Sequence, residues 1–184
     1  MLTLVKETGA GLANANSYAA VTDGDAYHEG HLYATAWTGV TAAQKAAALV
    51  MATRIIDATF QFNGFKTNAS QALQWPRRLC PDMDSDGASG VGLVFSRGTF
   101  LPETTIPAAV LQATCELARE LLVVDRTAAA PGEGLGLLRL EGALQLKFDA
   151  KNTPPIVPRL VQIMLGKLGE YIGRTTGAVR LVRA

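Results

Sequence analysis

Two histidines have the spacing of a metal site on a helix. His28 and His31 are three residues apart, with Asp25 and Glu29 close by in the sequence. Two imidazoles at helical spacing can bind a metal ion. No other part of the sequence supplies an obvious third ligand, so we favour the alternative that both histidines lie on a solvated helix face.

Three aspartates match the first half of a calcium-binding loop. Asp82, Asp84 and Asp86 are followed by Gly87 in the pattern D-x-D-x-D-G. Calcium needs six or more oxygen ligands, and the twelfth loop position should be a bidentate glutamate, but here it is Leu93. We therefore predict no metal site and no cofactor. The three aspartates remain a partial calcium candidate beside the alternative of an Asp-rich turn.

One segment has residues that could bind nucleic acid. Trp75 is followed by Pro76, Arg77 and Arg78, and an aromatic ring beside two arginines can stack on a base and hold a phosphate. The alternative is a structural corner in which Trp75 fills the core, Pro76 fixes the turn and Arg77 pairs with an acidic residue. We favour the structural corner, because proteins that bind single strands usually offer several aromatic rings.

The sequence contains no motif of an enzyme. It has no nucleophile elbow, Walker loop, zinc-protease helix or dinucleotide fingerprint. The two cysteines, Cys80 and Cys115, are too few for a disulfide scaffold or a four-cysteine zinc site. Cys115 lies within an apolar helical stripe, so we expect it in the core. We predict that the protein is not an enzyme.

Composition favours a single domain with a real core. The chain has 184 residues, of which 48% are hydrophobic and 18% charged, with a net charge of +1. This near-zero net charge argues against a protein that binds duplex DNA through a strongly positive electrostatic field. We expect no membrane segment, because no apolar run approaches about 20 residues, and no signal peptide.

Charge is unevenly distributed along the chain. Residues 151–184 carry six basic side chains and only Glu170 as an acid, so residues 1–150 are net acidic. A basic tail suggests an acidic partner, and the alternative is a solvated terminal helix. We divide the chain into a domain over 1–150 and a C-terminal helix with a basic arm over 151–184.

Periodicity predicts a mainly α fold: a small helical bundle with long loops, a β-hairpin and an extended C-terminal arm. Thr41 and Gln44 have capping-box spacing at the start of the clearest helix. Breaker residues make 61–105 a long irregular connection, with a short strand over 91–95. The predicted helices span 22–32 (with Thr22 as its N-cap), 41–60 and 107–124, and the hairpin spans 138–149. A last helix is predicted from the apolar stripe of Val161, Met164, Leu165 and Leu168.

Several segments, in this order, resemble a known family. They are Ala15-Asn16-Ser17-Tyr18, Asp25-Ala26-Tyr27, Trp37, Lys45 to Leu49, Ala52 to Asp57, Phe62-Asn63-Gly64, Gln71 to Arg77, and Ile106-Pro107 with the helix that follows. Together they resemble the head–tail connector proteins of long-tailed bacteriophages, whose members are often labelled DnaT-like single-stranded DNA-binding proteins. The resemblance covers roughly residues 13–122.

The resemblance implies a structural role in the virion. It implies an adaptor ring, typically of twelve copies, between the portal protein and a tail-side connector or tail terminator, with genomic DNA passing through its channel. Such a protein would assemble in the bacterial host cytoplasm. The family's C-terminal segment docks on the portal, which here points to Arg174, Arg180, Leu181, Val182 and Arg183. The alternative that the label implies is a single-stranded DNA-binding protein, with Trp75, Arg77 and Arg78 as its contacts.

Overall fold

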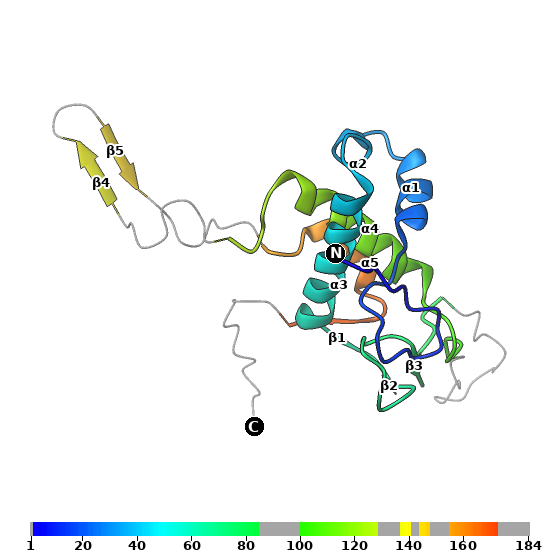
Figure 1. The fold of residues 1–184 in the computed structure, drawn as a ribbon. Helices are drawn as coiled ribbons and strands as arrows, with labels where there is room; N and C mark the ends of the chain where they lie inside the picture. The colour runs from blue at the N-terminus through cyan, green and yellow to red at the C-terminus, as the bar shows by residue number, and fades with distance from the viewer. Residues whose placement is uncertain (1, 85–99, 129–136, 141–143, 148–154, 173–184) are drawn as a thin grey trace, which may run out of the picture.

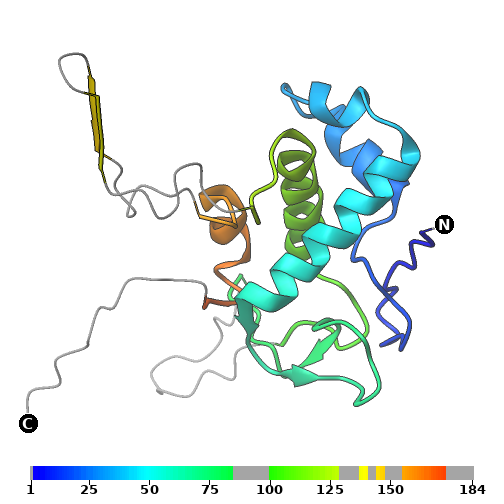
Figure 2. The same cartoon turned by 60° about the vertical axis from the view of Figure 1, so that its left-hand side comes forward.

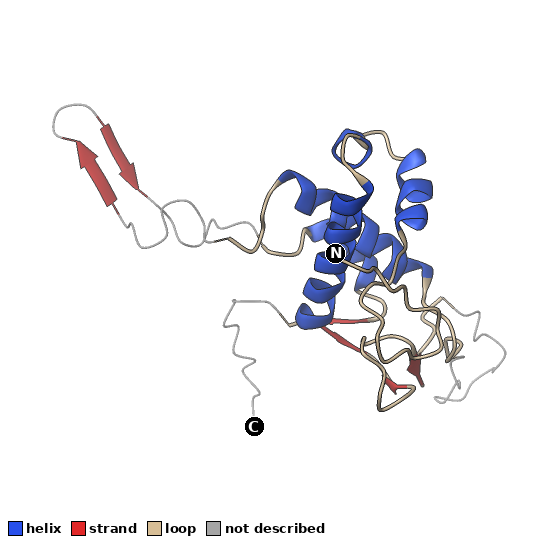
Figure 3. Ribbon diagram, in the orientation of Figure 1, coloured by secondary structure: helices blue, strands red, loops and turns tan. Residues whose placement is uncertain are grey.

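Two long helices form the centre of the fold, as the computed structural model shows (Figures 1 and 2). They are α3 (Ala42–Thr59) and α4 (Ala108–Val123). The structure describes residues 2–84, 100–128, 137–140, 144–147 and 155–172. Coloured by secondary structure, these residues are mainly helical, with three small two-stranded antiparallel sheets (Figure 3). The predicted fold class is confirmed.

The start of α3 is the predicted capping box. The backbone N–H of Gln44 donates to Thr41 Oγ1 at 3.3 Å, and the Thr41 N–H donates to Gln44 Oε1 at 3.0 Å. These bonds satisfy two donors at the helix end. The helix stops at Thr59, and Phe60 begins strand β1 (Phe60–Phe62) instead of the last turn.

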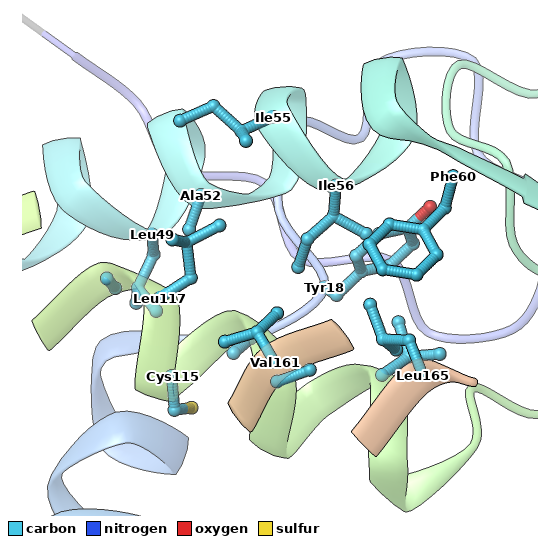
Figure 4. Packing of buried hydrophobic residues seen from close by; sticks show 14 of the residues in the cluster. Tyr18, Leu49, Ala52, Ile55, Ile56, Phe60, Cys115, Leu117, Val161 and Leu165 are labelled. Carbon is cyan, nitrogen blue, oxygen red and sulfur yellow. The ribbon is translucent and has the colours of Figure 1, made fainter. Parts of the chain in front are cut away.

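Apolar side chains from α3, α4 and α5 (Arg159–Leu165) meet in one core. Figure 4 shows Leu49 and Ile56 of α3, Leu117 of α4, and Val161 and Leu165 of α5 converging. All five are fully buried. Full burial of aliphatic side chains of this size supplies much of the folding free energy.

The core continues across the boundary drawn at residue 150. Val157, Val161 and Leu165 are fully buried within the same cluster as the α3 and α4 residues. Strand β6 (Gly169–Tyr171) pairs antiparallel with β1, with Phe60 opposite Tyr171. Residues 155–172 are therefore part of the main body, and residues 173–184 lie outside the described residues.

The first helix differs from its prediction at both ends. α1 spans Val21–Glu29, and its N-cap is Ala20 in place of Thr22. The reason is Asp23, whose Oδ2 accepts the Ala20 N–H at 2.7 Å from the first turn of the helix. A short helix that the sequence did not predict, α2 (Thr35–Thr38), carries the buried Trp37.

Two further sheets complete the described elements. Strands β2 (Phe65–Lys66) and β3 (Arg77–Arg78) lie in the connection predicted to be irregular. Strands β4 (Leu137–Leu140) and β5 (Leu144–Lys147) form the predicted antiparallel hairpin. The strand predicted over 91–95 lies outside the described residues. No helix within the described ranges combines the length and apolar character needed to cross a bilayer.

Candidate nucleic-acid interface

Trp75 lies in the core. Its side chain is fully buried, and its ring meets Phe62 edge to face with centroids 5.7 Å apart. Its backbone N–H donates to the Tyr18 hydroxyl oxygen at 3.2 Å. The ring has no free face on which a base could stack, so the structural interpretation of Trp75 is confirmed and its assignment as a nucleic-acid contact is wrong.

A buried polar network fastens the segment before Trp75 to α3. Asp57 on α3 accepts a hydrogen bond from the Tyr18 hydroxyl at Oδ1, and its Oδ2 accepts the Gln74 N–H at 3.0 Å. Burial raises the pKa of Asp57 to about 6, although both hydrogen bonds act in the opposite direction. Burial, followed by the Asp57 charge, raises the pKa of Tyr18 well above its ordinary value.

Arg77 is also a structural residue, with partners other than those predicted. Its Nε donates to the carbonyl oxygen of Asn63 at 2.7 Å, and its Nη2 to that of Gly64 at 2.6 Å. Its Nη1 donates to the backbone and side-chain oxygens of Gln74 at 3.2 and 3.1 Å. The expected pairing with an acidic residue is therefore wrong. With its guanidinium group occupied by neutral oxygens, the buried Arg77 is not available to a phosphate.

Arg78 points away from the core. Neighbouring residues of a strand face opposite sides of the sheet, so the burial of Arg77 leaves Arg78 exposed. In the β2–β3 register Arg78 stands directly opposite Phe65, whose side chain is 62% exposed. Directly opposed residues of an antiparallel pair lie on one face and within contact distance. We call this pair the Phe65–Arg78 surface.

Gly64 makes this pairing sterically feasible. It has a φ of +73°, and a Cβ at its position would lie 2.4 Å from the Arg78 carbonyl oxygen. Only glycine fits such a close approach in this conformation. The sequence did not indicate Phe65, because the aromatic residue next to the two arginines in the chain is Trp75. Phe65 lies beside Arg78 only through the pairing of β2 with β3. Strands of two residues carry no periodicity, so no signal in the sequence could have revealed the exposed position of Phe65.

Further apolar side chains are exposed on the segments next to this surface. Leu79, which follows Arg78, is exposed, and so is Phe100. Pro81 lies three residues after Arg78 in the chain, and it forms an isolated antiparallel bridge with Phe100. Cys80 between them is buried, and burial raises the pKa of its thiol. Among the described residues, this part of the molecule therefore offers the exposed rings of Phe65 and Phe100 and the exposed side chain of Arg78.

The two histidines lie in different environments against α4. His28 is buried, and its Nε2 lies 3.2 Å from the Cys115 carbonyl oxygen on α4. The predicted solvated position is thus wrong for His28. Burial lowers the pKa of its imidazole. His31 Nε2 lies 3.6 Å from Glu116 Oε2. Within the described residues, no group of three or more His, Cys, Asp or Glu side chains is placed to hold a metal. Cys115 is in the core, as predicted.

The aspartate cluster begins as a turn. The Asp84 N–H donates to Asp82 Oδ1 at 3.1 Å, which is the local bond expected of an Asp-rich turn. Asp84 Oδ1 also pairs with Lys167 Nζ at 2.5 Å. Asp86, the third calcium candidate, lies outside the described residues, as do the five residues predicted to dock on a portal, Arg174, Arg180, Leu181, Val182 and Arg183.

The fold and the Phe65–Arg78 surface define a small helical protein with an exposed aromatic–arginine pair on a short β-ribbon. Comparison with known families places it further: residues 2–184 match the family described as "Putative DnaT-like ssDNA binding protein". The chain belongs to this family. Comparison with curated proteins gave no match, and comparison with solved structures gave none either.

Proposed function

We propose that this protein binds single-stranded DNA through the Phe65–Arg78 surface. The observation that carries the proposal is an exposed phenylalanine directly opposite an exposed arginine on the β2–β3 ribbon. The description of the family to which the chain belongs supports the same activity. The contact residues proposed here replace Trp75 and Arg77, which are buried.

The chemistry of this pair suits an unpaired nucleotide. The exposed ring of Phe65 can stack on any of the four bases, and Arg78 can bind the adjacent phosphate. Stacking of this kind contributes about 1–3 kcal/mol per base. Because the net charge is only +1, we expect few phosphate contacts, so stacking should supply most of the affinity.

The test is a titration of labelled single-stranded DNA followed by fluorescence anisotropy. Phe65→Ala should raise Kd about 5- to 150-fold, which is the stacking energy expressed as affinity. Tyr33→Ala is the matched control, because Tyr33 is an exposed aromatic residue in the short segment between α1 and α2. Figure 1 shows these two helices at the opposite end of the body from β2. Equal affinities for Phe65→Ala and the wild-type protein would overturn the proposal.

The salt dependence tests the role of Arg78 separately. Each phosphate contact to a single strand contributes about 0.7 to the slope of log K against log salt concentration. Arg78→Ala should therefore make the slope shallower by about 0.7 and leave the stacking component in place. Binding that disappears entirely as salt rises, with no effect of Phe65→Ala, would indicate general electrostatic attraction only.

A second candidate function is the head–tail adaptor of a bacteriophage virion. The order of the motifs from Ala15 to Pro107 supports it, and so does the β4–β5 hairpin, which extends away from the helical body in Figures 1 and 2. An adaptor ring would contact neighbouring copies, the portal protein and a tail-side protein, and it would surround the genomic DNA. This role requires no catalysis and no cofactor.

The adaptor role is tested by removing the basic arm. Deleting Arg174–Ala184 should leave the fold intact, because the described core ends at β6. It should weaken binding to a purified portal protein, measured by co-sedimentation and by electron microscopy of the complex. A control deletes only Thr175–Gly177, which keeps all the arginines of the arm. Unchanged portal binding after the full deletion would exclude the arm as the docking segment.

A further inference from the structure

The turn between α1 and α2 carries the two most exposed large apolar side chains among the described residues. Leu32 and Tyr33 are 85% and 71% exposed. His31 comes just before them, and its Nδ1 accepts the Tyr33 backbone N–H at 3.0 Å. An imidazole nitrogen accepts a hydrogen bond only when it carries no proton. The bond therefore requires a neutral His31 ring with its proton on Nε2.

The other nitrogen of this ring faces a buried carboxylate on α4. His31 Nε2 lies 3.6 Å from Oε2 of Glu116, a residue that is only 2% exposed. Arg119 Nη2 donates to Glu116 Oε1 at 2.5 Å, whereas no described residue donates a hydrogen bond to Oε2. Leaving a buried carboxylate oxygen without a donor is costly, and a charged donor would satisfy it best. His31 is placed to become that donor.

The other titratable groups around this ring leave Glu116 as the acidic group that acts on it. On α1, the His28 ring lies 5.7 Å away between centroids, and burial lowers the pKa of His28, so this neighbour resists protonation. Burial, followed by the charge of Glu116, raises the pKa of Tyr27, so its phenol stays neutral. On α4, Arg119 is the opposing positive charge, and it is paired with both Glu116 and Glu120.

We propose that His31 is a pH-operated switch between two states of the turn after α1. In the neutral state its Nδ1 accepts the Tyr33 N–H. A proton taken up from solvent at Nδ1 makes both ring nitrogens donors, so the bond to Tyr33 is lost and Nε2 gains a charge-assisted bond to Glu116. Histidine is the side chain that ordinarily titrates between about pH 5 and pH 8. Acidification therefore releases the turn that carries Leu32 and Tyr33, and it fastens the ring to α4. The inference does not depend on DNA binding.

An NMR titration of the isotopically labelled full-length protein between about pH 8 and pH 5 tests the switch. At the alkaline end, the chemical shifts of the two ring nitrogens of His31 should identify the tautomer with its proton on Nε2. As the ring titrates, the Tyr33 amide signal should shift with the same midpoint, and its hydrogen bond should be lost. A proton on Nδ1 at the alkaline end, or a Tyr33 amide that does not respond to the titration of His31, would overturn the proposal.

Two substitutions separate the roles of the two ring nitrogens. His31→Asn can place an amide oxygen near the position of Nδ1 and cannot ionise, so the Tyr33 amide should stay bonded at every pH. His31→Gln can place an amide nitrogen near Nε2 but lacks the acceptor, so the Tyr33 amide should exchange faster than in His31→Asn at every pH. Equal exchange in the two variants would overturn the proposal. So would a Tyr33 amide that still titrates in His31→Asn, because the pH dependence would then belong to another group.

Glu116→Gln tests the contact with α4. It keeps the shape of the side chain and removes the charge, so the midpoint of the His31 titration should move to lower pH. Glu120→Gln is the matched control, because Glu120 also pairs with Arg119 and its removal should shift the midpoint less. Glu116→Asp, which keeps the charge and withdraws it from the ring, should lower the midpoint as well and serves if Glu116→Gln does not fold. A midpoint that none of the Glu116 substitutions lowers would overturn the proposal.

Discussion

Asp57 should make the stability of this protein depend on pH in a direction opposite to that of most carboxyl groups. Its side chain is largely buried between the Tyr18 hydroxyl and the Gln74 N–H, and burial raises its pKa from 3.8 to about 6. In the unfolded chain the carboxyl group should titrate near its ordinary value. Folding therefore favours the protonated form of Asp57.

The sign and size of the effect follow from this difference. A pKa that is higher in the folded state contributes stability below the unfolded pKa, and this contribution is lost as the pH rises through the folded pKa. The free energy of unfolding should thus fall between about pH 4 and pH 7. A difference of about two units between the folded and unfolded pKa of Asp57 corresponds to about 3 kcal/mol of unfolding free energy.

The perturbation is Asp57→Asn, which keeps the shape of the side chain and cannot ionise. Its amide can donate to the Tyr18 oxygen while its carbonyl oxygen accepts the Gln74 N–H. Other titrating groups act equally in both proteins. Among them is His28, whose burial-lowered pKa makes the folded state lose stability as the pH falls. The difference between the two proteins isolates Asp57.

Urea denaturation followed by tryptophan fluorescence at a series of pH values measures this difference. Relative to the wild-type protein, Asp57→Asn should gain about 3 kcal/mol in unfolding free energy between about pH 4 and pH 7. Parallel pH profiles for the two proteins would refute the reasoning. They would mean that the carboxyl group is better solvated than its position on α3 implies.

Three further substitutions test the packing. Trp75→Ala should reduce the unfolding free energy by about 3–5 kcal/mol, because the ring is fully buried. A much smaller loss, measured by chemical denaturation, would contradict the burial of the Trp75 ring. Leu117→Ala should cost about 2–5 kcal/mol in the same assay, while the exposed Gln112→Ala on the same helix should stay within about 0.5 kcal/mol. Gly64→Ala should separate β2 from β3, because the new Cβ would meet the Arg78 carbonyl oxygen. Faster hydrogen exchange of the ribbon amides would show this, and unchanged exchange would contradict it.

Local signals in the sequence predicted the long elements well. The capping box of α3 depends on Thr41 and Gln44, which are three residues apart, and the two strands of the β4–β5 hairpin are marked by alternation over a few residues. Such features are encoded by near neighbours, so the sequence alone reveals them. The same holds for the apolar stripe that places Cys115 in the core.

Contacts between distant segments were beyond the reach of the sequence. The three-residue strand β1 pairs with β6, more than a hundred residues further on, and segments this short carry no distinctive periodicity. His28 was expected in solvent because its own helix gives no sign of burial. Its neighbour in the structure is the Cys115 carbonyl oxygen on α4, 87 residues away.

The candidate site shows how buried contacts determine what is exposed. Arg77 is held inward by the carbonyl oxygens of Asn63 and Gly64, and the alternation of the strand then turns Arg78 outward. The register of β2 with β3 places Phe65 opposite Arg78. The contacts that remove Arg77 from any binding role are therefore the same contacts that position an exposed arginine beside an exposed aromatic ring. For this reason the pair of adjacent arginines, which the sequence presents as one basic site, divides into one structural residue and one residue available to a ligand.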